Sequence, residues 1–153
     1  MGKPVSIMVV GRATVDLIME IDQFSIRAEK FKASNSLFVV GGPGANASIA
    51  IARFGGQPAL ITYLGNDMMG KFIHQRLTDE AVDLSMSIIS PNAQSSVSAA
   101  FVDCRGERQT FNFPGKGFSE LPNVLKPNFK PSAILADNRH SKLTKWAIKV
   151  GQK

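Results

Sequence analysis

The stretch VVGGPGANASIAIARFGGQPALITYLGND, residues 39–67, constrains the fold more than any other part of the chain. Small or helix-compatible residues fill positions 45–54, and the pair Gly55-Gly56 supplies a C-terminal stop, so the pattern predicts a helix. PALITYLG, residues 58–65, is a continuous apolar run of strand length, which predicts a strand buried on both faces. A glycine-rich turn, a helix and a buried strand in this order are typical of a layered α/β protein.

The rest of the chain continues this alternation of strands and helices. Apolar runs predict a buried strand that ends in a glycine turn at VSIMVVGRATVD, residues 5–16, and a short buried strand at PSAILAD, residues 131–137. Apolar residues at helical spacing predict two more helices, at residues 67–82 and 141–150. We therefore expect an α/β fold in which helices cover a parallel sheet.

Three segments predict a smaller sheet of exposed strands beside this body. Residues 17–24 and 31–42 loosely alternate apolar and polar side chains, as half-exposed strands do. Residues 97–113, VSAAFVDCRGERQTFNF, contain two β-rich runs on either side of a turn glycine, which predicts a hairpin.

Charge and cysteine content narrow the range of partners. Residues 116–153 hold eight basic and two acidic residues and account for the whole net charge of +6. Without interleaved aromatic residues or a block of consecutive basic residues, this excess favours a solvated helix face over nucleic-acid binding.

No apolar run approaches the roughly 20 residues needed to span a bilayer. The single cysteine, Cys104, excludes an intrachain disulfide, and we predict a cytoplasmic protein with no nucleic-acid or membrane partner.

The residues of the glycine-rich loop allow more than one interpretation. Positions 42–47 fit the dinucleotide-binding pattern G-x-G-x-x-G/A, and Asp67 lies 20 residues further on. Against this, the loop follows an exposed strand, and the chain is short for two mononucleotide-binding halves. The glycines could instead form only a tight turn. A Walker A phosphate loop is excluded because no Lys-Ser or Lys-Thr follows the glycines.

Taken together, the motifs resemble those of the ribokinase-like sugar kinases of the PfkB type. GGPGANAS at residues 41–48 resembles the first motif of that family, VVGRATVD at 9–16 its opening strand, and GNDMMG at 65–70 its G-x-D-x-x-G helix. SAAFVDCRGERQTFNFPG at 98–115 is similar to the strand pair that carries G-E-R. The resemblance covers essentially the whole chain. It implies a ribokinase-like three-layer fold, present in part, with a small β-sheet lid formed by residues of about 17–40 and 96–113.

This resemblance implies that the glycine loop holds a sugar and that the phosphate donor binds elsewhere. Asp16, Gly41, Gly42 and Asn46 match positions that surround the sugar in such kinases. The chemistry agrees, because glycines let the backbone approach a polyol closely and an asparagine can both donate to and accept from hydroxyl groups.

A second set of residues resembles the ketose branch of the family, which includes ketohexokinase-like and sulfofructose-kinase-like enzymes. Lys30, Asn112 and Arg139 match residues that surround the anionic end of the sugar in the sulfofructose kinases. An arginine grips a sulfonate or phosphate with a planar fork, and a lysine with a point charge. Lys30 and Arg139 could equally be surface charges, and Asp137 either orients Arg139 or simply ends a strand.

The sequence also departs from the family pattern. Family members are much longer, and the GAGD-type motif of their second half, which carries the catalytic base, has no counterpart in residues 1–153. Pro43 and Ala81 replace a polar residue and a glycine that are common in relatives.

The resemblance therefore implies an ATP-dependent kinase that phosphorylates a hydroxymethyl group of a ketose-like sugar, of which this chain is the N-terminal, sugar-binding part. We expect the catalytic base and the sites for ATP and Mg²⁺ to be absent from this part, which should not turn over alone. Exposed lid strands imply a homodimer. A non-catalytic sugar-binding or dimerisation module is the alternative, and a dinucleotide-binding protein is a weaker one.

Overall fold

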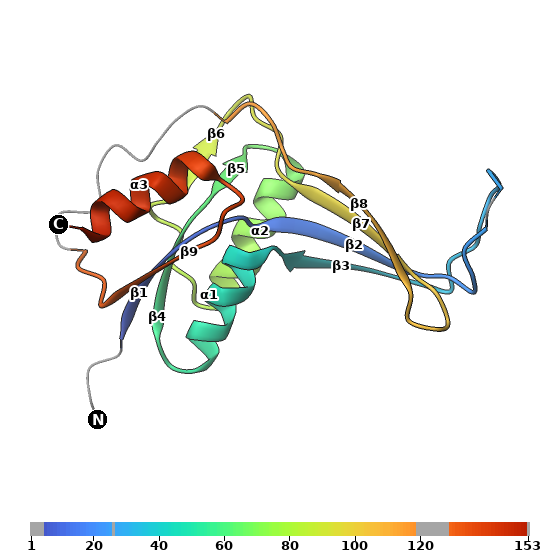
Figure 1. Cartoon of the computed structure of the whole chain (residues 1–153), viewed down its shortest axis with the longest axis horizontal. Helices are drawn as coiled ribbons and strands as arrows, with labels where there is room; N and C mark the ends of the chain where they lie inside the picture. Colours follow the sequence, from blue (N-terminus) through green and yellow to red (C-terminus); the bar gives the residue numbers. More distant parts are fainter. Residues whose placement is uncertain (1–4, 26, 119–128, 153) are drawn as a thin grey trace.

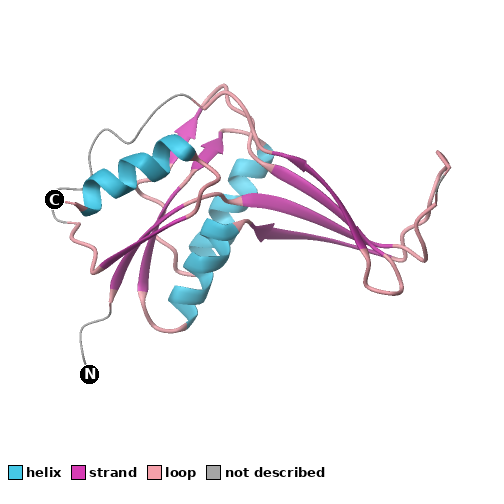
Figure 2. Cartoon of the chain, in the orientation of Figure 1, coloured by secondary structure: helices cyan, strands magenta, loops and turns pink. Residues whose placement is uncertain are grey.

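The computed structural model describes residues 5–25, 27–118 and 129–152, and it has the mixed α/β architecture that the sequence predicts. Figures 1 and 2 show a body of sheet and helices from which a second sheet projects. The elements in chain order are β1 (Ser6–Val10), β2 (Thr14–Glu20), β3 (Asn35–Gly41), α1 (Pro43–Arg53), β4 (Gln57–Ile61), β5 (Tyr63–Gly65), α2 (Met68–Asp79), β6 (Ile88–Ser90), β7 (Val97–Val102), β8 (Arg108–Phe113), β9 (Ala133–Ala136) and α3 (Ser141–Gly151).

The body is a three-layer sandwich around a small parallel sheet. The strand order β4-β1-β9 places β1 in the centre, and both of its pairings are parallel. Successive residues of a strand point to opposite faces of the sheet. Val9 therefore packs into the apolar cluster that includes α1 and α2, whereas Met8 and Val10 pack into the cluster that includes α3. Helices thus cover both faces of the sheet, as expected for such an apolar strand.

The predicted strand at residues 58–65 divides into two strands of different sheets. β4 pairs with β1, whereas β5 pairs with β6 in a separate two-stranded parallel sheet. Between them, the backbone N–H of Thr62 donates to the hydroxyl of Ser87 at 3.3 Å, and the Thr62 hydroxyl accepts the N–H of Ala13 at 3.3 Å. The whole run is buried as predicted. The three residues of β6 were not predicted, because so short a strand gives no clear period.

The predicted first strand, residues 5–16, also divides. β1 ends at Val10, and the chain crosses at residues 11–13 into β2, which belongs to the projecting sheet. Gly11 is required at this crossing, because the Cβ of any other residue would lie 2.5 Å from the Oδ2 atom of Asp137 and collide with it. Asp16, which was expected at the end of the first strand, therefore lies inside β2 instead.

β9 is more exposed than predicted. The sequence indicated a buried strand at residues 131–137, but β9 spans only four residues, and the side chain of Leu135 is 48% exposed. β9 pairs with β1 on one side, and no other described strand pairs with its second side.

The projecting sheet has the strand order β3-β2-β7-β8 and two different faces. Paired residues lie on the same face, so one row runs across all four strands through Val39, Asp16, Ser98 and Asn112. We name this side the aspartate face. The opposite side, which we name the phenylalanine face, carries Phe38, Leu17, Ala99 and Phe111 in the next row, with Phe101 and Phe113 beside them.

Ala81 occupies a backbone conformation that favours glycine. Its φ angle is +58°, in the left-handed region, and it follows α2. Its N–H donates to the carbonyl of Thr78 at 2.9 Å, and the N–H of Val82 donates to that of Leu77 at 3.0 Å, which closes the C-terminus of the helix. A glycine would adopt this conformation with less strain than an alanine.

Asp67 fixes the N-terminus of α2 and ties it to the segment before β7. Its Oδ1 atom accepts the N–H of Gly70 at 2.7 Å and the hydroxyl of Ser95 at 2.7 Å, and its Oδ2 atom accepts the N–H of Ser95 at 2.8 Å. Burial alone would raise the pKa of Asp67, but these hydrogen bonds outweigh it and hold the pKa below its ordinary value. Asp67 is thus a helix cap and not the acidic residue of a dinucleotide site.

We predict that Asp67→Ala lowers the free energy of unfolding by about 1–3 kcal/mol at pH 7. Because the folded-state pKa lies below the unfolded value of about 3.9, this contribution is complete above that value and is lost as the pH falls through the folded-state pKa. Urea denaturation at pH 7 and at pH 3 should therefore show a difference between wild type and variant that shrinks in acid. Asp79→Ala, at the other end of α2, is the control and should change stability little. An equal loss for both variants would contradict the capping role.

None of the described helices combines the length and the apolar character needed to cross a lipid bilayer.

Candidate functional site

The candidate site lies where the body meets the projecting sheet. The chain reaches this junction three times, at the end of β1, at the end of β3 and at the end of β9 (Figure 1). The backbones pack closely, because a Cβ on Gly44 would lie 2.7 Å from the carbonyl carbon of Gly11. The carbonyl oxygen of Arg12 accepts the N–H groups of Gly44 and Ala45 at 3.0 and 3.3 Å. The crossing segment therefore holds the first turn of α1 in place.

Gly41 and Gly42 are required at this junction for different reasons. A Cβ on Gly41 would overlap the Oδ2 atom of Asp16. Gly42 is the N-cap of α1 with φ +92° and ψ +148°, a conformation that is essentially restricted to glycine, and a Cβ there would lie 2.6 Å from the Arg12 carbonyl oxygen. Gly41 thus borders the Asp16 carboxylate, and Gly42 shapes the turn beside it.

Asp16 is a half-buried carboxylate that accepts no hydrogen bond from any described residue. Burial raises the pKa of its carboxyl above the ordinary value. The desolvated oxygens are free to accept hydrogen bonds from a ligand. Ser98 pairs with both Asp16 and Asn112, so the three side chains lie in one row across the aspartate face. Ser98 was not predicted, although its place in the hairpin opposite Asn112 could have indicated it.

Asn46 lies in the first turn of α1, one turn after Gly42. Its backbone N–H donates to the Gly42 carbonyl at 2.9 Å, and its side chain is exposed and makes no hydrogen bond within the described part of the chain. The structure therefore places Asn46 on the helix that starts at the glycine turn, as the sequence predicts.

Asp137 and Arg139 lie after β9 on the other side of the crossing. The Oδ2 atom of Asp137 accepts the backbone N–H of Arg12 at 2.8 Å, and its Oδ1 atom accepts the backbone N–H of Arg139 at 2.8 Å. Asp137 thus fixes the backbone of two arginines rather than pairing with a guanidinium group. Burial lowers the pKa of Arg12, the charge of Arg139 lowers it further, and Asp137 partly opposes this effect. Arg12 was not predicted as a site residue.

Lys30 does not lie near the other predicted residues of its own chain. β2 and β3 are antiparallel, and Thr14 pairs with Gly41 at the junction, whereas Glu20 pairs with Asn35 at the far end. Lys30 belongs to the loop beyond that far end, which Figure 1 shows extending away from the body. The sequence could not show this, because the distance depends on the length of the two strands.

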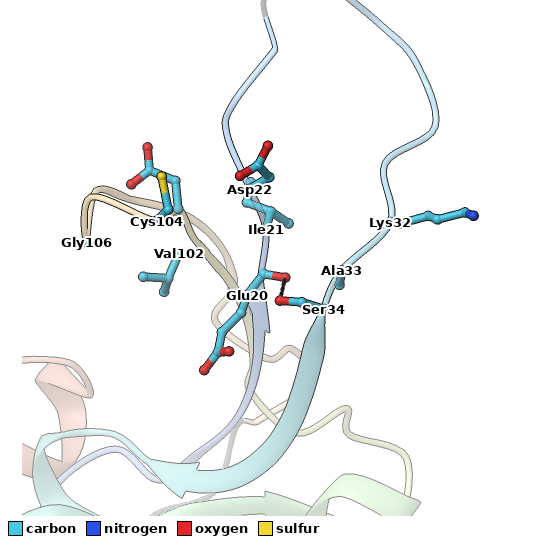
Figure 3. A pocket seen from close by; sticks show the side chains of 10 residues that line it. Glu20, Ile21, Asp22, Lys32, Ala33, Ser34, Val102, Cys104 and Gly106 are labelled. Atoms are coloured by element: carbon cyan, nitrogen blue, oxygen red, sulfur yellow. Dashed lines mark hydrogen bonds between the residues drawn. The ribbon is translucent and has the colours of Figure 1, made fainter.

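A pocket of about 710 Å³ also lies at this far end, between the loop after β2 and the turn after β7 (Figure 3). Its lining includes Glu20, Asp22, Lys32 and Cys104, and the Ser34 hydroxyl donates to the Glu20 carbonyl at 3.2 Å. No residue predicted for sugar binding lines this pocket, so we place the candidate site at the glycine turn.

Comparison with known proteins agrees with the motifs. Residues 5–145 match the pfkB family carbohydrate kinases. The chain is 31% identical over 124 residues to the aminoimidazole riboside kinase of Salmonella typhimurium and covers 35% of its length, with 79% of this chain aligned. It is 31% identical over 115 residues to a fructokinase of the same species, aligning 75% of this chain with 34% of that kinase. The chain therefore spans about a third of the length of these relatives.

The fold matches solved structures of the same kind. The structure of Arabidopsis thaliana ribokinase complexed with ribose and ATP superposes with a TM-score of 0.74 at 20% identity, and the match covers 98% of this chain and 52% of that protein. This likeness confirms the predicted ribokinase-like fold.

We predict that Gly42→Ala lowers the free energy of unfolding by more than about 3 kcal/mol, because the new Cβ is both in a disfavoured conformation and against the Arg12 carbonyl. Gly55→Ala is the matched control, since Gly55 also has a positive φ, +82°, but no atom within 4 Å of the added Cβ, and it should lose only about 1–2 kcal/mol. Urea denaturation at pH 7 measures both. Equal losses would mean that the close contact with Arg12 has no energetic weight.

Proposed function

Because the chain belongs to the pfkB family of carbohydrate kinases, we propose that the junction described above is the sugar site of an ATP-dependent sugar kinase. The observation that carries this proposal is the half-buried Asp16 carboxylate, which lies against Gly41 and has no hydrogen-bond partner in the described structure. A sugar hydroxyl would supply the donor that this carboxylate lacks.

The surrounding groups suit a ligand with several adjacent hydroxyls. Asp16 can only accept hydrogen bonds when ionised, whereas the amides of Asn46 and Asn112 can both donate and accept. The glycine turn at 41–42 has no side chain to obstruct a polyol, and the N-terminus of α1 adds positive potential. Together these groups would offer both acceptors and donors to the hydroxyls of a sugar.

We propose a ketose-like sugar as the substrate, phosphorylated on a hydroxymethyl group. The similarity to a fructokinase supports a ketose, whereas the similarity to an aminoimidazole riboside kinase would support a riboside instead. Arg139, beside Arg12, and Asn112 supply the groups that we assign to an anionic end of the sugar.

We propose that the phosphate donor is ATP with Mg²⁺ and that residues outside those described hold them. The described residues contain no group of three or more His, Cys, Asp or Glu side chains that could hold a metal ion. The part of the relatives that this chain does not match is where we place the donor site and the catalytic base. The 153-residue chain should then bind sugar without phosphorylating it. A cytoplasmic location suits an ATP-dependent reaction.

We propose that the projecting sheet is a lid and that two lids pair through their phenylalanine faces in a homodimer. Phe38 and Phe111 are 52% and 60% exposed, so this face leaves a large apolar area in water. Pairing would bury it while leaving the aspartate face turned toward the sugar. Pairing would also bring the loop that contains Lys30 toward the other subunit. Lys30 would then contact an anionic sugar in the site of the other subunit and not in its own.

We predict that Asp16→Asn weakens the binding of fructose to the chain by about ten- to hundredfold, because an amide replaces two charge-assisted acceptors. The substitution should not lower the free energy of unfolding. Burial raises the pKa of Asp16, so its ionised form at pH 7 is less favourable in the folded state than in the unfolded state, and a neutral amide removes this cost. Isothermal titration calorimetry at pH 7 measures the affinity. Asp22→Asn, in the loop after β2, is the control and should bind as wild type does. Undiminished affinity in Asp16→Asn would refute the assignment.

We predict that Phe38→Asp converts the dimer to a monomer, because a charge cannot be buried in an apolar interface without a partner. Leu37→Asp is the matched control: Leu37 is 53% exposed on the neighbouring position of the same strand, but it lies on the aspartate face. Sedimentation velocity should show a monomer for the first variant and a dimer for the second. A monomeric wild type, or dissociation by both variants, would contradict the proposed interface.

A further inference from the structure

The motif GNDMMG, residues 65–70, packs against one short segment of the chain that leads into the projecting sheet. This segment, residues 93–96, lies between β6 and β7, and we name it the β6–β7 segment. Its residues Ala93, Ser95 and Ser96 are buried. The capping of α2 accounts for Asp67 alone, so the two glycines of the motif need another explanation.

Both glycines and the aspartate of the motif face the β6–β7 segment. A Cβ on Gly65 would overlap the carbonyl oxygen of Ala93, and a Cβ on Gly70 would lie 2.8 Å from the hydroxyl oxygen of Ser95. Asp67 accepts the N–H of Ser95 at 2.8 Å and its hydroxyl at 2.7 Å. The same hydroxyl oxygen accepts the N–H of Gly65 at 2.9 Å. The glycines thus leave room for the segment, and the aspartate binds it.

The next residue of the segment, Ser96, holds the two strands that carry candidate sugar ligands. Its carbonyl oxygen accepts the N–H of Val15 at 3.1 Å, and Val15 precedes Asp16 in β2. Its hydroxyl donates to the carbonyl of Phe113 at 3.1 Å, and Phe113 follows Asn112 in β8. Ser96 therefore joins β2 and β8 at the ends that lie nearest to the body.

Gln94 fixes the segment on its other side. Its N–H donates to the carbonyl of Lys116 at 2.9 Å, and its carbonyl accepts the N–H of Lys116 at 3.1 Å. Lys116 lies in the turn that follows β8. Three successive residues thus have three different partners: Gln94 binds the turn after β8, Ser95 binds the motif in the body, and Ser96 binds β2 and β8.

We propose that the GNDMMG motif anchors the base of the projecting sheet to the body through Ser95, and that Ser95 is a positioning residue for the candidate sugar site. Ser95 acts through the backbone of Ser96, which holds the strands of Asp16 and Asn112, and through β7, which carries Ser98. Side chains held in place before a ligand arrives lose less freedom on binding, so anchoring raises affinity. The positioning role rests on the proposed function, whereas the anchor does not.

Ser87 provides a matched control inside the body. Its hydroxyl accepts the N–H of Thr62 at 3.3 Å and donates to the carbonyl of Leu60 at 2.7 Å, so it makes the same two kinds of hydrogen bond as the hydroxyl of Ser95. Neither of these partners belongs to the β6–β7 segment or to the projecting sheet. Ser87→Ala should therefore lower stability without loosening the base of that sheet.

The first measurement is amide hydrogen exchange of the ¹⁵N-labelled chain, which needs no ligand. Ser95→Ala should speed the exchange of the Val15 amide, which Ser96 protects, by about tenfold more than that of the Val82 amide at the end of α2. Ser87→Ala should change the two amides alike. Global destabilisation alone would do the same in Ser95→Ala.

The second measurement is the affinity for fructose by calorimetry at pH 7. Ser95→Ala should raise the dissociation constant about three- to tenfold, and Ser87→Ala should leave it unchanged. Asp67→Ser separates the anchor from the cap, because a serine caps a helix about as well as an aspartate but has only one short-armed oxygen for both groups of Ser95. It should melt at a higher temperature than Asp67→Ala and still bind fructose as weakly as Ser95→Ala does.

Selective exchange at Val15 together with weaker fructose binding supports both parts of the proposal. An equal change at Val15 and Val82 in Ser95→Ala would overturn the anchor. Wild-type affinity for fructose in Ser95→Ala would overturn the positioning role. If the wild-type chain binds no fructose, the proposed function fails, and the exchange measurement by itself then supports or overturns the anchor.

Discussion

The close packing of backbone at the crossing from β1 to β2 is the constraint on which the site depends. The carbonyl of Arg12 accepts two N–H groups from the first turn of α1, and its N–H donates to Asp137. A single short segment thus joins the central strand of the body, the helix that follows the glycine turn and the loop after β9. Gly11 and Gly44 allow this approach because neither carries a Cβ that would collide with the facing backbone or carboxylate.

Two carboxylates at this junction differ in how their hydrogen-bonding capacity is used. Asp137 accepts two backbone N–H groups and serves the architecture, whereas Asp16 accepts none from the described residues and is half-buried. The same contrast holds for the cations, since Arg53 pairs with Glu80 on the surface, whereas Arg12 has a buried Nε without a partner. Polar groups left unsatisfied within the protein are those available to a ligand, and here they are the acceptor oxygens of Asp16 and the Nε–H donor of Arg12.

Much of the fold could be predicted from local patterns. The helices α1, α2 and α3 follow from apolar spacing and from end signals such as Gly55-Gly56, and the α/β class follows from their alternation with strands. The division of residues 58–65 at Thr62 could not be predicted, because both parts are equally apolar and only their pairing with different strands separates them. In the site, the glycine turn was visible in the sequence. The isolation of Lys30 and the importance of Arg12 were not, since both depend on how far the projecting sheet extends and on what the crossing segment faces.

In the proposed function, a sugar binds at the junction between the body and the projecting sheet. The most direct test is an NMR titration of the ¹⁵N-labelled chain with fructose, followed through backbone amide shifts. We predict saturable changes confined to the amides of residues 41–47 and to those around Asp16, Ser98 and Asn112, with none in the loop that carries Lys30. Changes centred on the pocket at the far end of the projecting sheet, or no saturable change at all, would contradict the account.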